Sequence, residues 1–597
     1  MKILHLLFVI NALIFIGSLH IYGQNMNYGN GLPATDGLGR KLSVANGVQT
    51  AKENKFVGLF YWTWHTNFAD NKVADVSKIL AQKPEAINNY YDPIWPKEAS
   101  SFFWGEPLFG YYRDTDHWVL RKHAEMLADA GIDAIFFDCT NGSFTWKESY
   151  MELCEVFEKA RLDGVKAPQI VFMLGFGPTP DSRIAIRDIY NSLYKPGLYE
   201  DLWFRWKGKP LIMAYPEMLT DIDVPASEKA EDKEILDFFT FRPAQPVYDK
   251  GPTRPDHWGW LEIHPQHGFA PNEKGKFEQV TVGVSQNWSK ELGLSAMNSP
   301  NTFGRSYTDK RRQISGSDAV NYGYNFQEQW DRAIALDPEF IFITGWNEWI
   351  AGRFEEWQKQ KNAFPDQFSQ EKSRDIEPMK GGHGDNYYYQ MTENIRKFKG
   401  LMPLTLMPSE KTLKIDGEFD DWVSVKTEFN AYKGSTIHRD SRGWGDLYYT
   451  NTSGRNDIVR TKVAHDNKNI YFYVETADAI SPRTDNAWMR LLIDVDRNYN
   501  TGWKGYDFII NKTNPGKTAI VEQNTGEWGW TPVAEANYAV KGNKMEISIP
   551  RSILNLTDKI DLEFKWSDNM IKEGDIMDFY INGDVAPLGR FNYLYTE

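Results

Sequence analysis

The sequence predicts an α/β protein in two parts, a (β/α)8 TIM-like barrel followed by an all-β sandwich. Three observations carry this prediction. Eight apolar runs of strand length lie between residues 57 and 346, and helical patterns separate several of them, as in a parallel sheet closed into a barrel. Beyond residue 410 the apolar runs are short and alternating, with turns between them and no long helix, as in a sandwich.

The positions of these runs and patterns give the strands and helices that we expect in the first part. Gly131 follows a helical pattern as a C-cap signal. Residues 243–278 are dense in Pro and Gly and fit no ordinary helix, which predicts either an irregular barrel on that side or a misplaced sixth strand. The expected strands are 57–62, 132–138, 169–174, 210–215, 238–242, 260–263, 279–285 and 340–346, and the expected helices are 118–130, 149–162, 325–336 and 386–398.

We expect three segments, a signal peptide over 1–24, the barrel domain over 25–402 and the sandwich over 403–597. The N-terminus has one early Lys, a short apolar core and a small residue at Gly23, which is typical of a secretory signal. No later apolar run reaches the roughly 18 residues of a membrane span. The sequence therefore predicts a secreted or periplasmic protein without a membrane anchor after signal cleavage.

The amino-acid composition limits the classes of ligand that the chain is expected to bind. The chain has 67 basic and 81 acidic residues, a formal net charge of −14, which argues against binding to a nucleic-acid backbone. Aromatic residues reach 15%, which suits either a site lined with aromatic rings or simply an aromatic-rich core. Cys139 and Cys154 are expected as two buried thiols rather than as a disulfide.

The most informative segment runs from Phe340 to Trp349. A continuous apolar strand ends at Gly345, and Asn347, Glu348 and two Trp follow at once. A carboxylate at the C-terminal end of a buried parallel strand is where barrel enzymes place catalytic groups, and indole faces stack on sugar rings. The alternative is that Glu348 only caps the strand or pairs with an Arg.

Cleavage of a glycosidic bond needs two carboxyl groups. Glu348 is the first candidate, and Asp138 or Glu262 is expected as the second, with Glu217 and Glu377 competing. No metal or cofactor is expected to be required for catalysis. Side chains expected to contact a polysaccharide or oligosaccharide are Trp62, Trp64, His65, Asn141, Arg242, His264, His267, Gln286, Trp288, Trp346, Asn347 and Trp349.

A loop in the second part alternates oxygen ligands and ends in Gly. Ca²⁺ takes six to eight oxygens, and a loop of this pattern supplies several. It lacks the closing Glu of an EF-hand and follows a strand, so a structural Ca²⁺ site and a polar hairpin without metal both fit. The candidate ligands are Asp494, Asp496, Asn498 and Asn500.

The run Gly345–Trp349, followed by Asp375–Pro378 and Gly384–Tyr388, resembles the glycoside hydrolase family 99-like barrels, a group that includes endo-α-mannosidases. The resemblance extends over residues 55–400 and implies a (β/α)8 barrel that cleaves glycosidic bonds. The family's second Glu falls here on Ala351. Its two-Glu mechanism is therefore not carried over intact.

Three replacements for the missing carboxylate are open. Glu355 or Glu356 takes its place through an insertion, another strand supplies it, or the chemistry differs. The C-terminal part resembles family 9 carbohydrate-binding modules in its segments 414–422, 469–474 and 492–496, which implies a β-sandwich of a kind that often holds Ca²⁺.

These observations predict an exported glycoside hydrolase with carboxylate acid/base catalysis. Two alternatives remain. One is a non-catalytic glycan-binding protein with a degenerate barrel. The other is a metal-dependent polysaccharide hydrolase or lyase that uses Glu262, His264 and His267.

Overall fold

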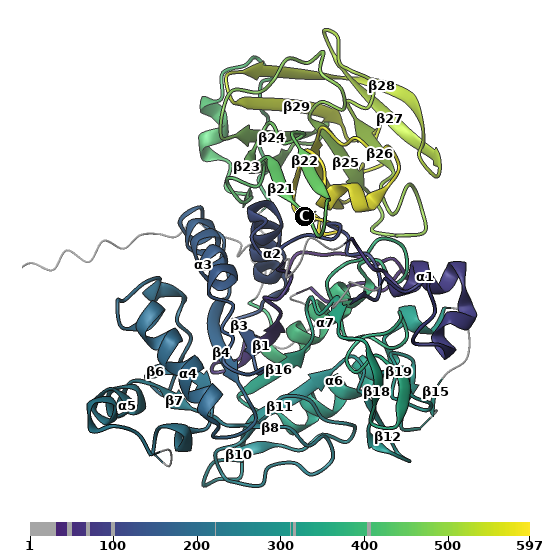
Figure 1. Cartoon of the computed structure of the whole chain (residues 1–597). Coiled ribbons are helices and arrows are strands. Elements are labelled where there is room, and N and C mark those ends of the chain that lie inside the picture. Colours follow the sequence, from purple (N-terminus) through teal and green to yellow (C-terminus); the bar gives the residue numbers. More distant parts are fainter. Residues whose placement is uncertain are drawn as a thin grey trace, which may run out of the picture.

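The computed structural model shows a mixed α/β part and a separate antiparallel β-sheet part (Figure 1). The expected signal peptide lies outside the described residues, and so does the segment 403–407 at the expected domain boundary. None of the described helices has the length and apolar character needed to cross a bilayer. The structure describes residues 31–44, 50–66, 72–96, 102–220, 223–310, 312–313, 318–402 and 408–597.

A curled, mostly parallel sheet forms the centre of the first part. Its neighbouring long strands all pair in parallel, and each begins within a few residues of its predicted position. In spatial order they are β11 (Phe277–Gly283), β16 (Phe340–Thr344), β1 (Phe56–Tyr61), β3 (Ala134–Cys139), β4 (Gln169–Leu174) and β6 (Lys209–Met213).

The remaining side of the ring is irregular, as the Pro- and Gly-rich stretch predicted. The short strand β7 (Thr240–Phe241) pairs with β6, whereas β8 (Ala244–Gln245) and β9 (Trp258–Gly259) pair only with each other. No backbone ladder joins β9 to β11 among the described residues. The side-chain amide of Gln279 bonds both the N–H and the C=O of Gly259 instead. The structure thus shows a curled sheet rather than a regular closed barrel.

Helices cover the outside of the sheet where the predicted strands are regular. The helix α2 ends at Gly131 in the left-handed conformation (φ 85°), which confirms the expected C-cap. No helix is described between β7 and β11. The helices are α1 (Val76–Gln82), α2 (His117–Ala130), α3 (Lys147–Leu162), α4 (Pro180–Ile189), α5 (Ala226–Phe238), α6 (Tyr324–Leu336) and α7 (Asn386–Lys399).

Alternate side chains of each strand point to opposite faces of the sheet, so a separate hydrophobic core packs on each face. Phe60, Phe136 and Phe342 lie in the inner core, and the other face packs under the helices. Asp138 shares the inner face with Phe136, and Trp62 shares it with Phe60. The free thiols Cys139 and Cys154 are buried, as expected. Minor strands of this part are β2 (Phe102–Phe103), β5 (Arg205–Trp206), β10 (Phe269–Pro271), β12 (Trp288–Ser289), β13 (Gly293–Leu294), β14 (Tyr307–Thr308), β15 (Arg312–Gln313), β17 (Ile350–Ala351), β18 (Phe354–Trp357) and β19 (Gln360–Ala363).

The main sheet of the second part is antiparallel and has 11 strands, and it folds back on itself through the long strand β28. Phe429 and Phe472 on one half contact Phe564 on the other, with ring centroids 5.5 and 5.3 Å apart. Its strands are β20 (Glu428–Asn430), β23 (Ile458–His465), β24 (Asn469–Thr476), β25 (Arg490–Asp494), β26 (Phe508–Ile510), β27 (Ala519–Gly526), β28 (Gly529–Lys541), β29 (Lys544–Pro550), β30 (Asp561–Asp568), β31 (Asp584–Ala586) and β32 (Tyr593–Thr596).

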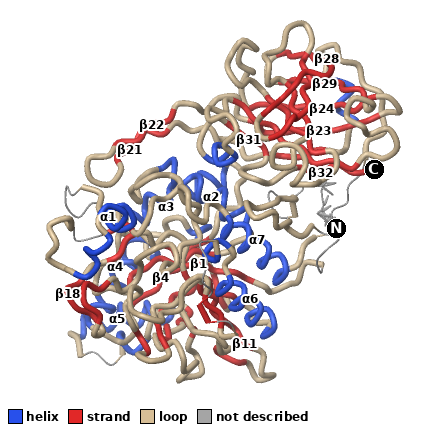
Figure 2. Tube along the Cα trace, turned by 90° about the vertical axis from the view of Figure 1, so that its right-hand side faces the viewer, coloured by secondary structure: helices blue, strands red, loops and turns tan. Residues whose placement is uncertain are grey.

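A hairpin of the second part, β21 (Arg439–Arg442) and β22 (Tyr448–Asn451), lies over the first part (Figure 2). Its tip carries Trp444, which is buried and meets Phe103 edge-on at 5.4 Å. The backbone N–H of Trp444 also donates to the backbone carbonyl of Tyr111 at 2.7 Å. The hairpin therefore anchors the two parts to each other.

We expect Trp444→Ala to lower the free energy of unfolding by about 3 kcal/mol, because it empties a buried indole site. Chemical unfolding of the full chain measures the change. Tyr448→Ala, an exposed aromatic on the same hairpin, should cost within about 0.5 kcal/mol. Equal effects of the two substitutions would contradict the anchor.

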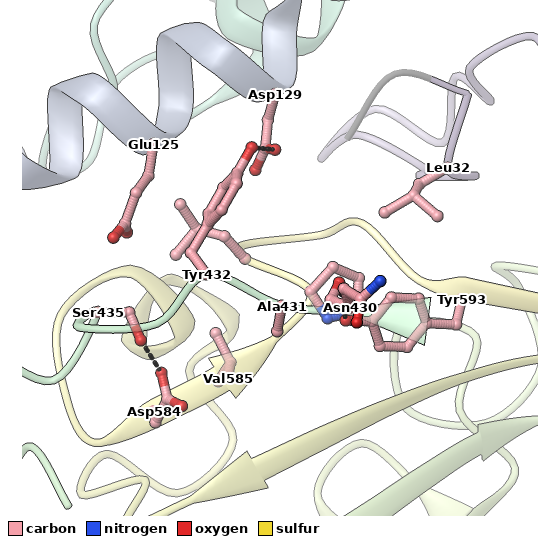
Figure 3. Close-up of a pocket in the computed structure, with 12 residues that line it drawn as sticks. Leu32, Glu125, Asp129, Asn430, Ala431, Tyr432, Ser435, Asp584, Val585 and Tyr593 are labelled. Atoms are coloured by element: carbon pink, nitrogen blue, oxygen red, sulfur yellow. Dashed lines mark hydrogen bonds between the residues drawn. The ribbon is translucent and has the colours of Figure 1, made fainter. Parts of the chain in front are cut away.

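Buried carboxyl groups line a small cavity of about 30 Å³ between α2 and the second part (Figure 3). The Tyr432 hydroxyl donates to Asp129 and the Ser435 hydroxyl donates to Asp584, each at 2.7 Å. Burial raises the pKa of Asp129 to about 7, opposed by the Tyr432 hydrogen bond. Burial also raises the pKa of Asp584, and the nearby Asp457 adds to this.

These groups predict a pH dependence of stability. Because the folded pKa of Asp129 is about 7 and that of a free Asp is about 4, the folded state holds its proton more tightly. From this group alone, the free energy of unfolding should fall by about 1.4 kcal/mol for each unit by which the pH rises between these two pKa values. Asp129→Asn should remove that slope in unfolding curves, and Asp181→Asn, on the exposed face of α4, should keep it. An unchanged slope in the Asp129 variant would refute this assignment.

Candidate active site

Glu348 forms a buried ion pair just beyond β16. Arg374 donates to both of its carboxylate oxygens, at 2.8 and 3.0 Å, and neither side chain is more than 2% exposed. Burial raises the pKa of Glu348, and the bound Arg374 opposes this rise. Although burial opposes it, Glu348 in turn raises the pKa of Arg374. Both oxygens of Glu348 therefore accept a hydrogen bond from Arg374.

Asp138 projects from the end of β3 onto the inner face of the sheet. Its Oδ1 accepts from the N–H and the hydroxyl of Thr140, at 3.0 and 2.7 Å. Its Oδ2 accepts no hydrogen bond from a described residue. Burial raises the pKa of Asp138 to about 6, Asp366 adds to the rise and Arg374 opposes it. This carboxyl has an oxygen available to a ligand and a pKa near neutrality, as acid/base catalysis requires.

Arg374 brings further polar groups to the same place. It donates to Asn287 at 3.3 Å and lies 3.5 Å from a carboxylate oxygen of Asp366. The Tyr248 hydroxyl donates to the same Asn287 oxygen at 2.7 Å. The Asp366 side chain is 41% exposed, so it offers a second accessible carboxylate near Asp138.

Aromatic rings lead from this cluster to the surface. The rings of Trp62 and Trp64 stack at 4.2 Å, Trp146 stacks on Trp64 at 5.5 Å, and Phe144 stacks on Trp146 at 5.5 Å. Phe144 is 61% exposed. The indole N–H groups of Trp62 and Trp64 are buried without a hydrogen-bond partner. Trp260 lies under the Arg374 guanidinium at 5.7 Å.

Glu262 lies in a separate hydrogen-bonded loop. Its two oxygens accept from the backbone N–H and the ring of His267, at 2.8 and 2.9 Å. Burial raises the pKa of Glu262, opposed by His267. Within the part of the chain that the structure describes, Glu262, His264 and His267 do not form a three-ligand metal cluster. The geometry gives no support to metal-dependent catalysis there.

Arg242 does not join the cluster. Its guanidinium binds Glu278 at 2.8 and 3.0 Å, and Glu278 lies at the start of β11, at the opposite end of the strands. Arg242 instead closes the amino-terminal end of the sheet beside Trp206 and Trp258, which also donate to Glu278.

Several residues that the sequence places in the site instead hold the scaffold together. Asn347 bonds both backbone groups of Trp62. Trp346 is fully buried, and Trp349 is buried against Trp104 at 5.0 Å. Glu377 accepts from Trp349, Tyr112 and His123 within the core. Two further predicted residues are held by buried partners: Gln286 pairs with Asn325, and His65 pairs with Asp114. The ring of Trp288 meets that of Phe303 edge-on. Asn141 is exposed beside Thr140.

Position 351 offers no carboxylate, and its neighbours do not replace one. Ala351 is buried in β17, where it pairs with Phe102. Glu355 and Glu356 stand exposed on the β18–β19 hairpin, with Glu355 beside Tyr91. The exposed carboxylate beside Arg374 belongs to Asp366, which lies outside this hairpin.

Sequence reasoning missed five residues of the group around Asp138 and Arg374. Only Arg374 carried a signal, because it immediately precedes the motif 375–378. The others come from loops whose positions depend on the fold. The five are Tyr248, Trp146, Trp260, Asp366 and Arg374.

The second part contains a group of carboxylates that suits a cation. Asp494, Asp496 and Asp507 place one oxygen each within 4.8 Å of one another. Burial raises the pKa of Asp494 to about 8, and Glu563 and Asp507 add to it. Such mutual repulsion is what a bound divalent cation relieves. Asn498 and Asn500 shape the loop through the hydrogen bond from the Asn500 N–H to Asn498, and Asp507 was missed from the sequence.

No family model and no curated protein matches the chain. Among solved structures, it is similar to the GH99 endo-α-mannosidase from Bacteroides thetaiotaomicron, at 15% identity and a TM-score of 0.32, covering 58% of this chain and 98% of that chain. A family 9 carbohydrate-binding module from Caldicellulosiruptor kristjanssonii, in complex with cellotriose, matches at 15% identity and a TM-score of 0.15, over 27% of this chain and 75% of that chain. A family 39 glycoside hydrolase from Bacteroides cellulosilyticus matches at 12% identity and a TM-score of 0.21, over 74% and 81%. Two of these three neighbours are glycoside hydrolases and one is a carbohydrate-binding module.

Proposed function

We propose that this chain is an exported glycoside hydrolase in which Asp138 acts as general acid. The observation that carries the proposal is the state of Asp138. Of the three carboxylates expected from the sequence, it alone keeps an oxygen without a described partner, and its pKa is about 6. An acid with a raised pKa protonates the leaving oxygen of a glycosidic bond.

The second carboxyl role falls to Asp366 in this proposal. Glu348 and Glu262 have both oxygens engaged, whereas Asp366 is partly exposed and lies against Arg374. Glu348 then acts by holding Arg374 in place. The stacked rings of Trp62, Trp64 and Trp146 supply the sugar-binding platform. We take the curled sheet, together with β7 to β9, as an irregular (β/α)8 barrel.

The test is a screen of purified full chain against a broad panel of polysaccharides, with release of reducing ends as the readout. Release from at least one glycan supports the proposal. Binding without release on every glycan would overturn it and favour the second candidate, a non-catalytic glycan-binding protein. The locked Glu348–Arg374 pair and Ala351 are the observations that favour that candidate.

We also propose that Asp494, Asp496 and Asp507 hold a structural Ca²⁺. Addition of Ca²⁺ to chelator-treated protein should raise the free energy of unfolding by about 2.7 kcal/mol at a hundredfold excess over the dissociation constant. Asp507→Asn should abolish the rise, and Asp558→Asn, an exposed carboxylate of the same domain, should not. A rise that persists in the Asp507 variant would place the ion elsewhere.

A further inference from the structure

A second pocket lies between the two parts of the chain, away from the residues around Asp138. It has a volume of about 550 Å³, within the range of small-molecule sites, which favour domain interfaces. The first part contributes Phe109 and Trp118, and the second contributes Tyr449 on β22 with the segments around Ser453 and Asn582. Nothing in the mechanism proposed above uses this pocket.

The wall from the second part is a fixed array of amides and hydroxyls. The Asn451 amide donates to the carbonyl of Ile581 at 2.8 Å and to the Asn582 side chain at 3.1 Å. The Ser453 hydroxyl donates to Asn451 and accepts from the Gly583 N–H at 2.9 Å. These bonds hold the polar side chains in set orientations before any ligand arrives. Both N–H groups of Asn451 are used in these bonds. The hydroxyls of the exposed lining residues Thr450 and Thr452 form no hydrogen bond with a described residue, so they are the groups left to bind a polyhydroxylated ligand.

One basic side chain of the pocket lining has no acidic partner among the described residues. The formal net charge is −14, yet the lining contains Lys380, Arg439 and Lys572 and no Asp or Glu. Lys380 pairs with Glu106, and Arg439 pairs with Asp116. Lys572 is exposed at the pocket and forms no ion pair with a residue that the structure describes.

We propose that this junction pocket binds an acidic oligosaccharide, one that carries carboxylate or sulfate groups. The hydroxyls of Thr450 and Thr452 bind the sugar hydroxyls, the rings of the first part and Tyr449 supply apolar contact, and Lys572 binds the anionic group as a point charge. The saccharide class rests on the proposed function. The binding itself needs no turnover.

The experiment is calorimetric titration of the full chain with three tetrasaccharides of equal length: a uronate, a sulfated and a neutral one. The uronate or the sulfated sugar should bind, more weakly as salt is raised, and the neutral one should bind at least about tenfold more weakly. Comparison of the two acidic sugars tells carboxylate from sulfate recognition.

Two variants locate the site and two controls isolate it. Lys572→Ala should weaken binding by about 10-fold or more, and Thr452→Trp, at an exposed lining position, should block it. Lys559→Ala, an exposed lysine of the same domain, should leave it unchanged. Asp138→Asn should also keep it, so that failure of the proposed activity stays distinct from failure of this site.

Three results would overturn the inference. They are no binding of any of the three sugars, equal binding of the neutral and acidic sugars, and binding that survives both Lys572→Ala and Thr452→Trp.

Discussion

Asp138→Asn lowers the rate of glycosidic cleavage by about 10²- to 10⁴-fold, the range for removal of a positioned general acid or base. Asn has the same shape and can still accept the Thr140 hydrogen bonds at Oδ1, so folding is expected to be retained. It cannot supply a proton at the open position. The measurement is kcat on a glycan that the wild type cleaves, with circular dichroism to confirm the fold.

Variants of two other carboxylates, Asp366 and Glu262, are the comparisons for this result. Asp366→Asn should cause a loss of similar size, because it removes the second carboxyl role. Glu262→Gln should lower kcat far less, because both Glu262 oxygens are bound to His267. Full activity in the Asp138 variant would remove that residue from the mechanism.

The pH profile separates the two possible roles of Asp138. Its pKa is about 6, so a general acid loses its proton, and the rate falls, as the pH rises above that value. This limb should be absent from the residual activity of Asp138→Asn. A wild-type rate that instead rises through the same pH range would make Asp138 the base.

Arg374→Met should lower the free energy of unfolding by about 3 to 5 kcal/mol, the cost of leaving a buried charge without its partner. Glu348 is 2% exposed at its side chain and has no other described donor at hydrogen-bonding distance. The substitution also releases Asn287 and Asp366 from Arg374, so kcat should fall with stability.

The double variant Glu348→Leu with Arg374→Met distinguishes the ion pair from simple packing. It removes both charges, so most of the lost stability should return, as found when buried pairs are replaced by apolar residues. Additive losses in the double variant would show that the two side chains act independently. Denaturant unfolding of the four proteins gives the coupling free energy.

The regular strands could be predicted from sequence because their apolar runs are continuous. This holds for β1, β3, β4 and β16. The region of β7 to β9 could not, because one junction there depends on the Gln279 side chain rather than on a backbone ladder. No periodic pattern encodes such a bond.

The candidate site was predictable in its strand-end carboxylates but not in their partners. The sequence left open that Glu348 pairs with an Arg, and the structure shows that Arg to be Arg374, 26 positions away. Trp346 and Trp349 suit a sugar platform and a core equally well, because an indole is a large apolar surface in either setting. Only their burial decides that they belong to the core.

The most direct test of the central claim is cleavage in heavy-oxygen water by the wild type. Hydrolysis adds one water across the glycosidic bond, so the account predicts heavy oxygen at the newly released reducing end by mass spectrometry. It also predicts loss of that labelled product with Asp138→Asn. An unsaturated, unlabelled product would show a lyase, and bound but uncleaved glycan would show a binding protein; either result would contradict the account.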